Sequence, residues 1–196
     1  RRVLTLEQME QAVQRTCKGT LLDLNGLAQG YSVDLLAFLM DRNGVLDYMI
    51  ELGGEVRAKG KNPLGNDWQI GIDQPKDGVS EDRPLQAVVA LQNNSIATSG
   101  GYRKYYERDG KRFSHVLDPA TGRPVSHQLL SVSVMHPSCA MADGFATALM
   151  VMGPAKARQW SQKHSETGVY LIYLDHSGKA KTWANEKAHS LIRELN

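Results

Sequence analysis

The sequence predicts an α+β fold in which helices pack on a largely antiparallel sheet. Two observations support this class: the predicted strands outnumber the helices, and neighbouring strands are often joined by hairpin-type turns. At 196 residues, 41% of them hydrophobic, the chain is long enough to bury a core in one large domain or two small ones. No apolar run is long enough to span a bilayer.

The first element is expected to be a helix from Thr5 to about Arg15. Thr5 can cap its start, and Leu6, Met9 and Val13 recur at the spacing of one helix face. A short extended piece and a glycine turn then lead into a helix from about Tyr31, which Gly44 is expected to end. The strands predicted next are Tyr48–Leu52, Trp68–Ile72 and Leu85–Leu91.

The second half of the chain continues with a hairpin centred on Asp109-Gly110 and a strand from Leu130 to Met135. A helix follows, with Ser138 as its N-cap and Gly153-Pro154 as its stop. The remaining predicted elements are a helix from Pro154, a strand at Val169–Leu174, a turn at His176–Gly178, a strand near Lys181–Trp183 and a final helix.

The charge balance argues against two classes of partner. A net charge of +2 without a basic cluster does not indicate binding to nucleic acid or to a membrane surface. Cys17 and Cys139 lie far apart and lack CxxC spacing, so a zinc or redox motif is not indicated. Whether they form a disulfide or remain buried thiols stays open.

The stretch MADGFATALMVMG, Met141–Gly153, places one carboxylate and one hydroxyl in an otherwise apolar run. Asp143 and Thr147 are four residues apart, so they share a helix face directed into the core, where an unpaired carboxylate is costly. Two interpretations stay open. Either neighbouring backbone satisfies Asp143 while Thr147 bonds to the carbonyl of residue 143, or both side chains hold a hard cation such as Mg²⁺.

Two glycine-containing stretches are further candidates for ligand contact. DLNGLAQGYSVD (Asp23–Asp34) presents two glycines and a carboxylate before a helix, where the backbone can approach a phosphate or a cation. A plain strand-to-helix connection is the alternative. ELGGEVRAKG (Glu51–Gly60) has a Gly-Gly between two strands, which is usually a simple bend.

Two later stretches are rich in polar side chains. SIATSGGYRKYY (Ser95–Tyr106) puts small hydroxyl residues beside glycines, which suits a bound nucleotide or a self-satisfied turn. HVLDPATGRPV (His115–Val125) brings His, Asp, Thr and Arg within nine residues, on a loop stiffened by two prolines and a glycine. This density on a rigid loop indicates a site more than an ordinary turn.

Taken in order, DLNGLAQGYSVD, ELGGEVRAKG, ATSGGYRKYYERDGKRFSHVLDPATGRPV and MADGFATALMVMG resemble the ApbE family of FAD:protein FMN transferases. The resemblance runs from about Leu22 to the C-terminus. It implies an ApbE-like (T-fold-like) core. It also implies a Mg²⁺-dependent transfer of FMN from FAD to a Thr or Ser hydroxyl of an acceptor protein that carries a flavinylation motif, with release of AMP.

The resemblance also implies particular site residues. In this family the Asp and Thr of the corresponding helix hold magnesium, which here are Asp143 and Thr147. A backbone carbonyl of the first glycine turn, here that of Gly26, joins them. The residues implied to contact FAD are Asp23, Gln29 and Leu117.

His115 is hypothesised to be the general base that removes the acceptor's hydroxyl proton, because a histidine suits that task near neutral pH. Two other functions stay open. The same residues would serve a Mg²⁺-dependent FAD pyrophosphatase that gives AMP and FMN, and a non-catalytic flavin-binding protein would need binding alone.

The sequence departs from the family pattern at two points. Gln29 stands where many members carry Lys, which removes one positive partner for the FAD diphosphate. Members commonly exceed 300 residues, so 1–196 is expected to be a single ApbE-like region without the N-terminal part that surrounds the isoalloxazine ring. Because the family is often exported and lipid-anchored, the full-length protein is expected in the periplasm, reaching the membrane only through a lipid anchor absent from this chain.

Overall fold

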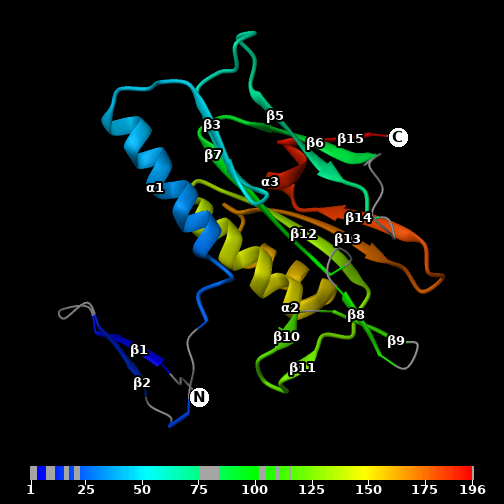
Figure 1. Cartoon of the computed structure of the whole chain (residues 1–196). Coiled ribbons are helices and arrows are strands. Elements are labelled where there is room, and N and C mark those ends of the chain that lie inside the picture. Colours follow the sequence, from blue (N-terminus) through cyan, green and yellow to red (C-terminus); the bar gives the residue numbers. More distant parts are fainter. Residues whose placement is uncertain are drawn as a thin grey trace.

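The computed structural model describes residues 4–7, 12–15, 18–19, 23–75, 84–101, 105–108, 111–114 and 116–195. The main body has three layers (Figure 1). Helices α1 (Ala28–Arg42) and α2 (Cys139–Lys163) cover one face of a six-stranded sheet. A three-stranded sheet and the short helix α3 (Glu186–His189) cover the opposite face.

The strand pairs are antiparallel in every sheet, which confirms the predicted α+β class. The six-stranded sheet has the order β14 (Ala180–Ala184), β13 (Gly168–Leu174), β12 (Leu129–His136), β7 (Asn94–Gly100), β4 (Glu55–Lys59) and β3 (Tyr48–Leu52). The three-stranded sheet has the order β15 (Ile192–Glu194), β6 (Leu85–Leu91) and β5 (Trp68–Asp73). The two-stranded hairpins are β1 (Leu4–Glu7) with β2 (Ala12–Arg15), β8 (Tyr105–Arg108) with β9 (Lys111–Ser114), and β10 (Leu117–Asp118) with β11 (Arg123–Pro124).

Alternate residues of the central strands fill two different cores. Val132 and Val134 of β12 pack against α2, whereas Met135 of the same strand packs against the three-stranded sheet. Tyr170 and Ile172 of β13 also pack against the three-stranded sheet. This period of two follows from the pleat of a strand and explains why these strands are apolar on both faces.

The helix predicted for Thr5–Arg15 is wrong, because β1 and β2 pair as an antiparallel hairpin with Leu4 opposite Arg15. Leu4 and Leu6 alternate with polar neighbours, so the apolar spacing fits a period of two as well as a helical one. The hydrogen-bonded pairing of the two strands selects the period of two. A stretch of four residues is too short to distinguish that period from a helical one. Residues 8–11 lie outside the described residues.

Helix α1 begins at Ala28, earlier than the predicted Tyr31, because the turn at 25–27 continues directly into it. The Tyr31 N–H already donates to the Leu27 carbonyl at 2.9 Å. The helix ends at Arg42, and Gly44 follows in the left-handed region with φ of 73° while its N–H donates to the Asp41 carbonyl. Gly44 therefore ends the helix as predicted.

Helix α2 consists of two parts that meet at Gly153, which has φ of 78° and ψ of 173°. The Phe145 and Trp160 rings lie 4.8 Å apart, although a straight helix would separate these positions by roughly 22 Å. The second part therefore folds back along the first. The break confirms the predicted stop at Gly153-Pro154 and the predicted helix from Pro154. At the start, the Ser138 hydroxyl accepts from the Met141 N–H at 3.3 Å, which confirms the predicted N-cap.

A histidine satisfies the carbonyl that this break leaves exposed. Pro154 has no N–H to donate to the Met150 carbonyl, and His127 Nε2 donates to that oxygen at 2.7 Å instead. His127 Nδ1 accepts from the Leu129 N–H at 3.3 Å, which ties the start of β12 to the break. A Cβ at Gly153 would lie 2.9 Å from the His127 ring, so glycine is needed for this contact as well as for its backbone angles.

The final helix predicted from the sequence is the four-residue α3, which Asn185 caps through a hydrogen bond from the Ala188 N–H at 3.0 Å. Strand β15 follows it and pairs with β6, and the sequence pattern did not indicate this strand.

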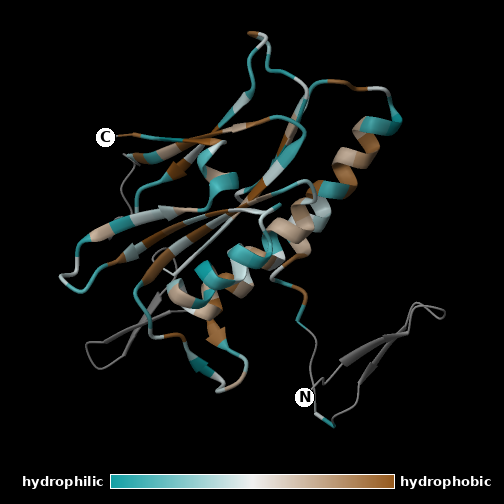
Figure 2. Cartoon of the chain, turned by 180° about the vertical axis from the view of Figure 1, so that it is seen from behind, coloured by the Kyte–Doolittle hydropathy of each residue, from teal (hydrophilic) through white to brown (hydrophobic). Residues whose placement is uncertain are grey.

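The outer face of α1 is apolar and exposed (Figure 2). Its exposed large side chains are Tyr31, Leu35, Leu36, Phe38 and Leu39. A contiguous apolar surface of this kind usually marks a packing or interaction surface. Among the described residues, no helix combines the length and apolar character needed to cross a membrane.

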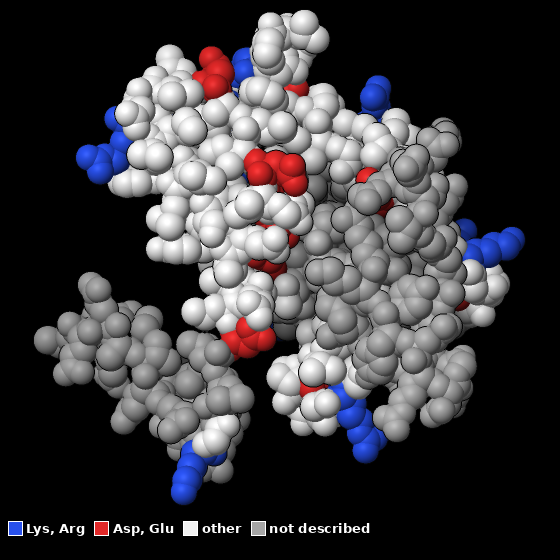
Figure 3. Space-filling model, in the orientation of Figure 1, with Lys and Arg blue, Asp and Glu red and all other residues white. Residues whose placement is uncertain are grey.

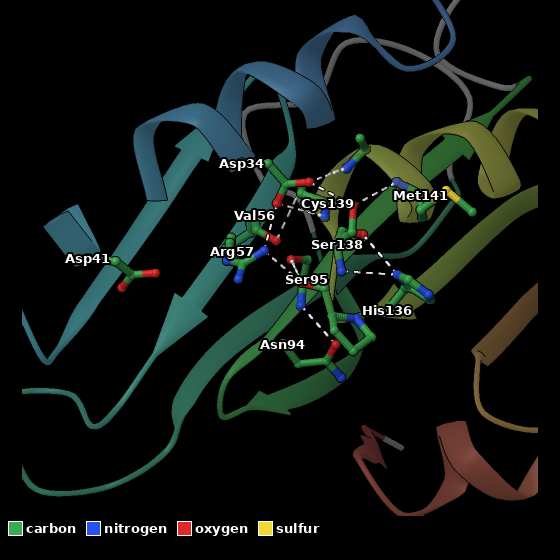
Figure 4. Close-up of polar contacts among 12 residues, drawn as sticks. Asp34, Asp41, Val56, Arg57, Asn94, Ser95, His136, Ser138, Cys139 and Met141 are labelled. Atoms are coloured by element: carbon green, nitrogen blue, oxygen red, sulfur yellow. Dashed lines mark hydrogen bonds and ion pairs between the residues drawn. The ribbon is translucent and has the colours of Figure 1, made fainter. Parts of the chain in front are cut away.

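Asp34 joins α1 to the start of α2 (Figure 4). Its carboxylate accepts from the Ser138 hydroxyl at 2.7 Å and from the Cys139 and Ala140 N–H groups at 3.0 Å each. Arg57 of β4 also donates to it at 2.7 Å. Burial alone would raise the pKa of Asp34, but these hydrogen bonds lower it below the ordinary value of 3.8. One carboxylate thus fixes two helices and a strand relative to one another.

Replacing Asp34 with Asn should lower the free energy of unfolding by about 2 kcal/mol at pH 7, somewhat less than for a fully buried pair. The pKa of Asp34 is depressed in the folded state. Its contribution is therefore complete above pH 4 or so and is lost as the pH falls below 3.8 through the folded-state pKa. Chemical denaturation of both proteins at several pH values measures this, and the difference should shrink in acid.

Asp41→Asn is the matched control, because Asp41 also lies on α1 and pairs with one cation, Lys59 at 2.8 Å. Both side chains of that pair are more than a third exposed, so solvent screens their interaction and the loss should be clearly smaller than for Asp34→Asn. Equal losses for the two variants would show that Asp34 has no special structural role.

Candidate functional site

The turn before α1 and the first part of α2 meet beside the first turn of α1, and they carry the predicted metal ligands. A Cβ placed on Gly26 would lie 3.1 Å from Thr147 Cγ2 and 3.4 Å from Thr147 Oγ1. A Cβ placed on Gly144, the residue after Asp143, would lie 3.9 Å from the Gly26 carbonyl oxygen. The structure therefore brings the turn that carries Gly26 against the helix face that carries Asp143 and Thr147.

Asp143 is buried, with 7% of its surface exposed. Its Oδ2 accepts from the Gly30 N–H at 3.1 Å. Burial raises the pKa of Asp143, and the single hydrogen bond from Gly30 offsets only part of that rise. In the part of the chain that the structure describes, no Lys, Arg or His side chain pairs with this carboxylate. Of the two interpretations of Asp143, the one in which neighbouring backbone satisfies the carboxylate is therefore supported by one hydrogen bond only, that from the Gly30 amide.

Gly30 allows this close approach of the two helices. A Cβ at this position would lie 2.8 Å from Asp143 Cβ and still closer to the carbonyl oxygen of Cys139. Because the obstructing atoms include backbone at the start of α2, a larger residue at position 30 would force the helices apart. The second glycine of DLNGLAQGYSVD therefore has a packing role.

Glu55 is a second buried carboxylate at this junction. It is 6% exposed, and within the described part of the chain its Oε2 has no hydrogen-bond partner. Burial and then the negative charge of Asp143 raise the pKa of Glu55 to about 7. Sequence reasoning missed this residue, although the available signal was an acid placed directly after Gly53-Gly54 at the start of a strand.

The FAD-contact residues predicted in the first motif lie in the same region. Asp23 is exposed, and its Oδ1 accepts from the Asn25 N–H at 2.9 Å, which shapes the turn before α1. The Gln29 amide lies directly against Gly53, whose φ of 68° is in the left-handed region. The β3–β4 turn and the first turn of α1 therefore form one continuous surface.

The other predicted residues lie on a separate segment. Leu117, in the β10–β11 hairpin, is 54% exposed. The neighbouring Val116 is buried in the core that includes Ala146 and Leu149 of α2, so this hairpin is anchored against the helix that carries Asp143. His115, the predicted general base, lies outside the described residues.

Among the described residues, acidic side chains gather around the start of α1. Figure 3 shows Asp and Glu side chains along the central part of this face, while the described Lys and Arg side chains lie towards its periphery. Two carboxylates, those of Asp143 and Glu55, are buried here without a described basic partner. A cation bound here would supply the missing positive charge.

The oxygen atoms present fit magnesium. Asp143 offers a carboxylate, Thr147 a hydroxyl and Gly26 a carbonyl, all of them hard oxygen donors. Among the described residues, no group of three or more His, Cys, Asp or Glu side chains could enclose a metal by itself. A magnesium ion held by these three residues would complete its coordination with water and substrate oxygens.

Thiol chemistry does not contribute to this site. Cys139 is a free and buried thiol whose Sγ donates to the Val56 carbonyl at 3.8 Å. Burial raises the pKa of the Cys139 thiol to about 12, which makes it a poor nucleophile near neutral pH. Cys17 lies outside the described residues.

Comparison with known proteins points to one family. The model of the ApbE family matches residues 2–172. The FAD:protein FMN transferase of Klebsiella pneumoniae is 40% identical over 187 residues, covering 95% of this chain and 52% of the relative. The protein of the same name from Vibrio cholerae is 46% identical over 154 residues, covering 79% of this chain and 45% of the relative.

Solved structures show the same similarity. The flavin transferase ApbE from Vibrio cholerae matches with a TM-score of 0.82 and 34% identity, covering 96% of this chain and 58% of that one. The apo form of Pseudomonas stutzeri flavinyl transferase ApbE matches with a TM-score of 0.80 and 33% identity, covering 96% and 56%. The chain thus spans about half the length of the curated relatives that it matches.

Replacing Gly30 with Ala should destabilise the protein by about 2 kcal/mol. The added methyl group overlaps backbone at the start of α2, which costs about 3 kcal/mol, while alanine's better helix propensity returns about 1 kcal/mol. Chemical denaturation measures the net effect. Gly144→Ala is the matched control, because a Cβ there meets nothing nearer than 3.9 Å and should be neutral or stabilising. A stable Gly30→Ala protein would contradict the close packing.

Proposed function

The chain belongs to the ApbE family, and from this premise we propose that it catalyses magnesium-dependent transfer of FMN from FAD to a Thr or Ser hydroxyl of an acceptor protein, with release of AMP. One observation carries the proposal. A buried carboxylate, Asp143, lies beside Gly26 and Thr147, and within the described residues it has one backbone amide and no basic side chain as partner. A site for a hard cation and a diphosphate explains this arrangement.

The residues around the first turn of α1 are proposed to bind two groups, the magnesium ion and FAD. Asp143, Thr147 and the Gly26 carbonyl would hold magnesium, which when bound neutralises charge on the FAD diphosphate and makes AMP a better leaving group. Gln29 lies in the first turn of α1, where free backbone N–H groups and the helix dipole favour an anion. Asp23 and Leu117 are proposed to contact other parts of FAD.

The chemical step replaces a phosphoanhydride bond of FAD with a phosphoester bond to the acceptor. The acceptor's hydroxyl oxygen forms a bond to the FMN phosphorus, the bond from that phosphorus to the bridging oxygen breaks, and AMP leaves with the bridging oxygen. His115 is proposed to take the hydroxyl proton as the oxygen attacks. The product is a flavin joined to the acceptor protein through a phosphoester.

Within the described residues, neither buried carboxylate has a basic partner, and this also bears on the substrate. A diphosphate brought to Asp143 and Glu55 without a cation would meet like charges, which disfavours binding. Gln29, a neutral residue, adds no positive charge at the first turn of α1. FAD binding by this chain should therefore depend strongly on the divalent cation.

Intact-mass spectrometry of an acceptor domain incubated with FAD, magnesium and this protein tests the proposed function. The acceptor should gain the mass of one FMN group while AMP appears in equal amount. Asp143→Asn should abolish both, because the charge that binds the cation is lost while the side chain keeps its size. Thr147→Val should weaken the reaction more mildly, because a neutral hydroxyl is the lesser ligand.

Two outcomes of this experiment would reject transfer. AMP and free FMN without a mass gain on the acceptor would identify a pyrophosphatase. Bound flavin without any AMP, whatever metal is added, would identify a non-catalytic flavin-binding protein. Chelation with EDTA should stop the wild-type reaction, and added magnesium should restore it.

Replacing His115 with Ala should reduce the rate of flavin transfer by about a hundredfold or more, because general-base catalysis typically contributes that much. FAD binding should stay nearly unchanged, since a base acts on the acceptor hydroxyl. Single-turnover kinetics and an FAD titration on the same variant measure the two quantities separately. Equal losses in binding and in rate would instead make His115 a positioning residue.

A further inference from the structure

The buried carboxylate of Glu55 is unexplained by the fold. Glu55 begins β4 directly after the Gly53-Gly54 turn, and only 6% of its surface is exposed. Its Oε2 is buried and has no hydrogen-bond partner among the residues that the structure describes. A buried acceptor without a donor destabilises the folded state, and more so when it is charged. A carboxylate kept for structure alone would be paired, as Asp34 is.

Glu55 lies at the same turn of α1 as Asp143 does. A Cβ placed on Gly53 would lie 3.5 Å from Glu55 Oε2 and would collide with the Gln29 amide. The next residue along α1, Gly30, donates its N–H to Asp143 at 3.1 Å. Both buried carboxylates therefore lie near the first turn of α1, Glu55 beside the turn that meets Gln29 and Asp143 bonded to Gly30.

The proposed ligands of the cation do not fill all of its coordination positions. Asp143, Thr147 and Gly26 supply one carboxylate and two neutral oxygens, so a six-coordinate magnesium ion would keep several water molecules until substrate oxygens replace them. Water molecules on a divalent cation are strong hydrogen-bond donors. Hydrogen-bond acceptors that lie beyond the metal's own ligands orient such water molecules, and their loss commonly weakens metal affinity by about one to two orders of magnitude.

We propose that Glu55 is this outer acceptor, and that its Oε2 takes a hydrogen bond from a water molecule bound to the cation at Asp143. This inference rests on the proposed function, because it assumes the cation site. It extends the set of site residues to the ELGGE stretch, whose Gly-Gly turn brings the carboxylate beside the first turn of α1. The role is to position a cation-bound water and to supply a second negative charge near the cation.

Titration of the metal-free chain with MnCl₂, followed by calorimetry or by the electron paramagnetic resonance of free Mn²⁺, tests this inference without FAD or acceptor. Glu55→Gln should weaken Mn²⁺ binding about tenfold, because the amide keeps the size of the side chain but loses its charge. Glu51→Gln is the matched control, since Glu51 makes the same charge change on the facing strand but is exposed and bonds to the Gly54 N–H. Its Mn²⁺ affinity should change less than twofold.

Thermal unfolding of the metal-free proteins adds a second measurement, for which the proposed role and a purely structural role predict different changes in melting temperature. Glu55→Gln should leave the melting temperature unchanged or raise it, because an unpaired buried charge is removed. A carboxylate with a purely structural role would instead give a lower melting temperature. Glu55→Asp, which keeps the charge on a shorter side chain, should bind Mn²⁺ more tightly than Glu55→Gln, and it serves as the second variant if Glu55→Gln folds poorly.

The outcomes separate this inference from the proposed function. If wild type binds Mn²⁺ and transfers FMN but Glu55→Gln binds Mn²⁺ equally well, the role of Glu55 is wrong and the function stands. Unchanged Mn²⁺ affinity with weakened FAD binding would show that Glu55 serves the Gln29 amide instead, which also overturns the inference. If wild type itself binds no Mn²⁺ and Asp143→Asn changes nothing, the proposed cation site fails.

Discussion

Helix α1 lies so close to the first turns of α2 that a backbone N–H of one helix reaches a side chain of the other. Gly30 makes this approach sterically possible, and its N–H then donates to Asp143 at 3.1 Å. One turn further along α1, Asp34 accepts from the first N–H groups of α2 and from Arg57 on β4. The α1–α2 contact therefore sets the position of Asp143 and Thr147 relative to the turn that carries Gly26.

The acids at this contact divide into two kinds. Asp34 is paired with Arg57 and with the N-terminus of α2, so hydrogen bonds lower its pKa despite burial. Asp143 and Glu55 are buried without a described basic partner, and burial raises the pKa of each. The fold stabilises the first and tolerates the cost of the other two. Such costs are typical of functional sites, where a ligand supplies the missing charge.

The sequence predicted the fold class, the end of α1 at Gly44, the start of α2 at Ser138 and the break at Gly153, because capping residues and glycines act locally. It placed the start of α1 three residues too late. It failed for Thr5–Arg15, where short apolar spacing fits both a strand and a helix and pairing between strands decides. For the site, helical spacing alone put Asp143 and Thr147 on one face. The role of Gly30 and the burial of Glu55 depend on how distant segments pack, which no local pattern encodes. Gly30, Val33 and Ala37 do recur at helical spacing, and with Asp34 they mark the face of α1 that meets α2.

The central claim is that a divalent cation binds between Asp143, Thr147 and the Gly26 carbonyl. Crystals of the protein soaked in MnCl₂ test it most directly, because manganese is located by anomalous scattering without assumptions about activity. The account predicts an anomalous peak within coordination distance of Asp143 and Thr147, about 2.2 Å from the ligand oxygens. Asp143 bonded only to the Gly30 amide, with no density between it and Thr147, would contradict the account.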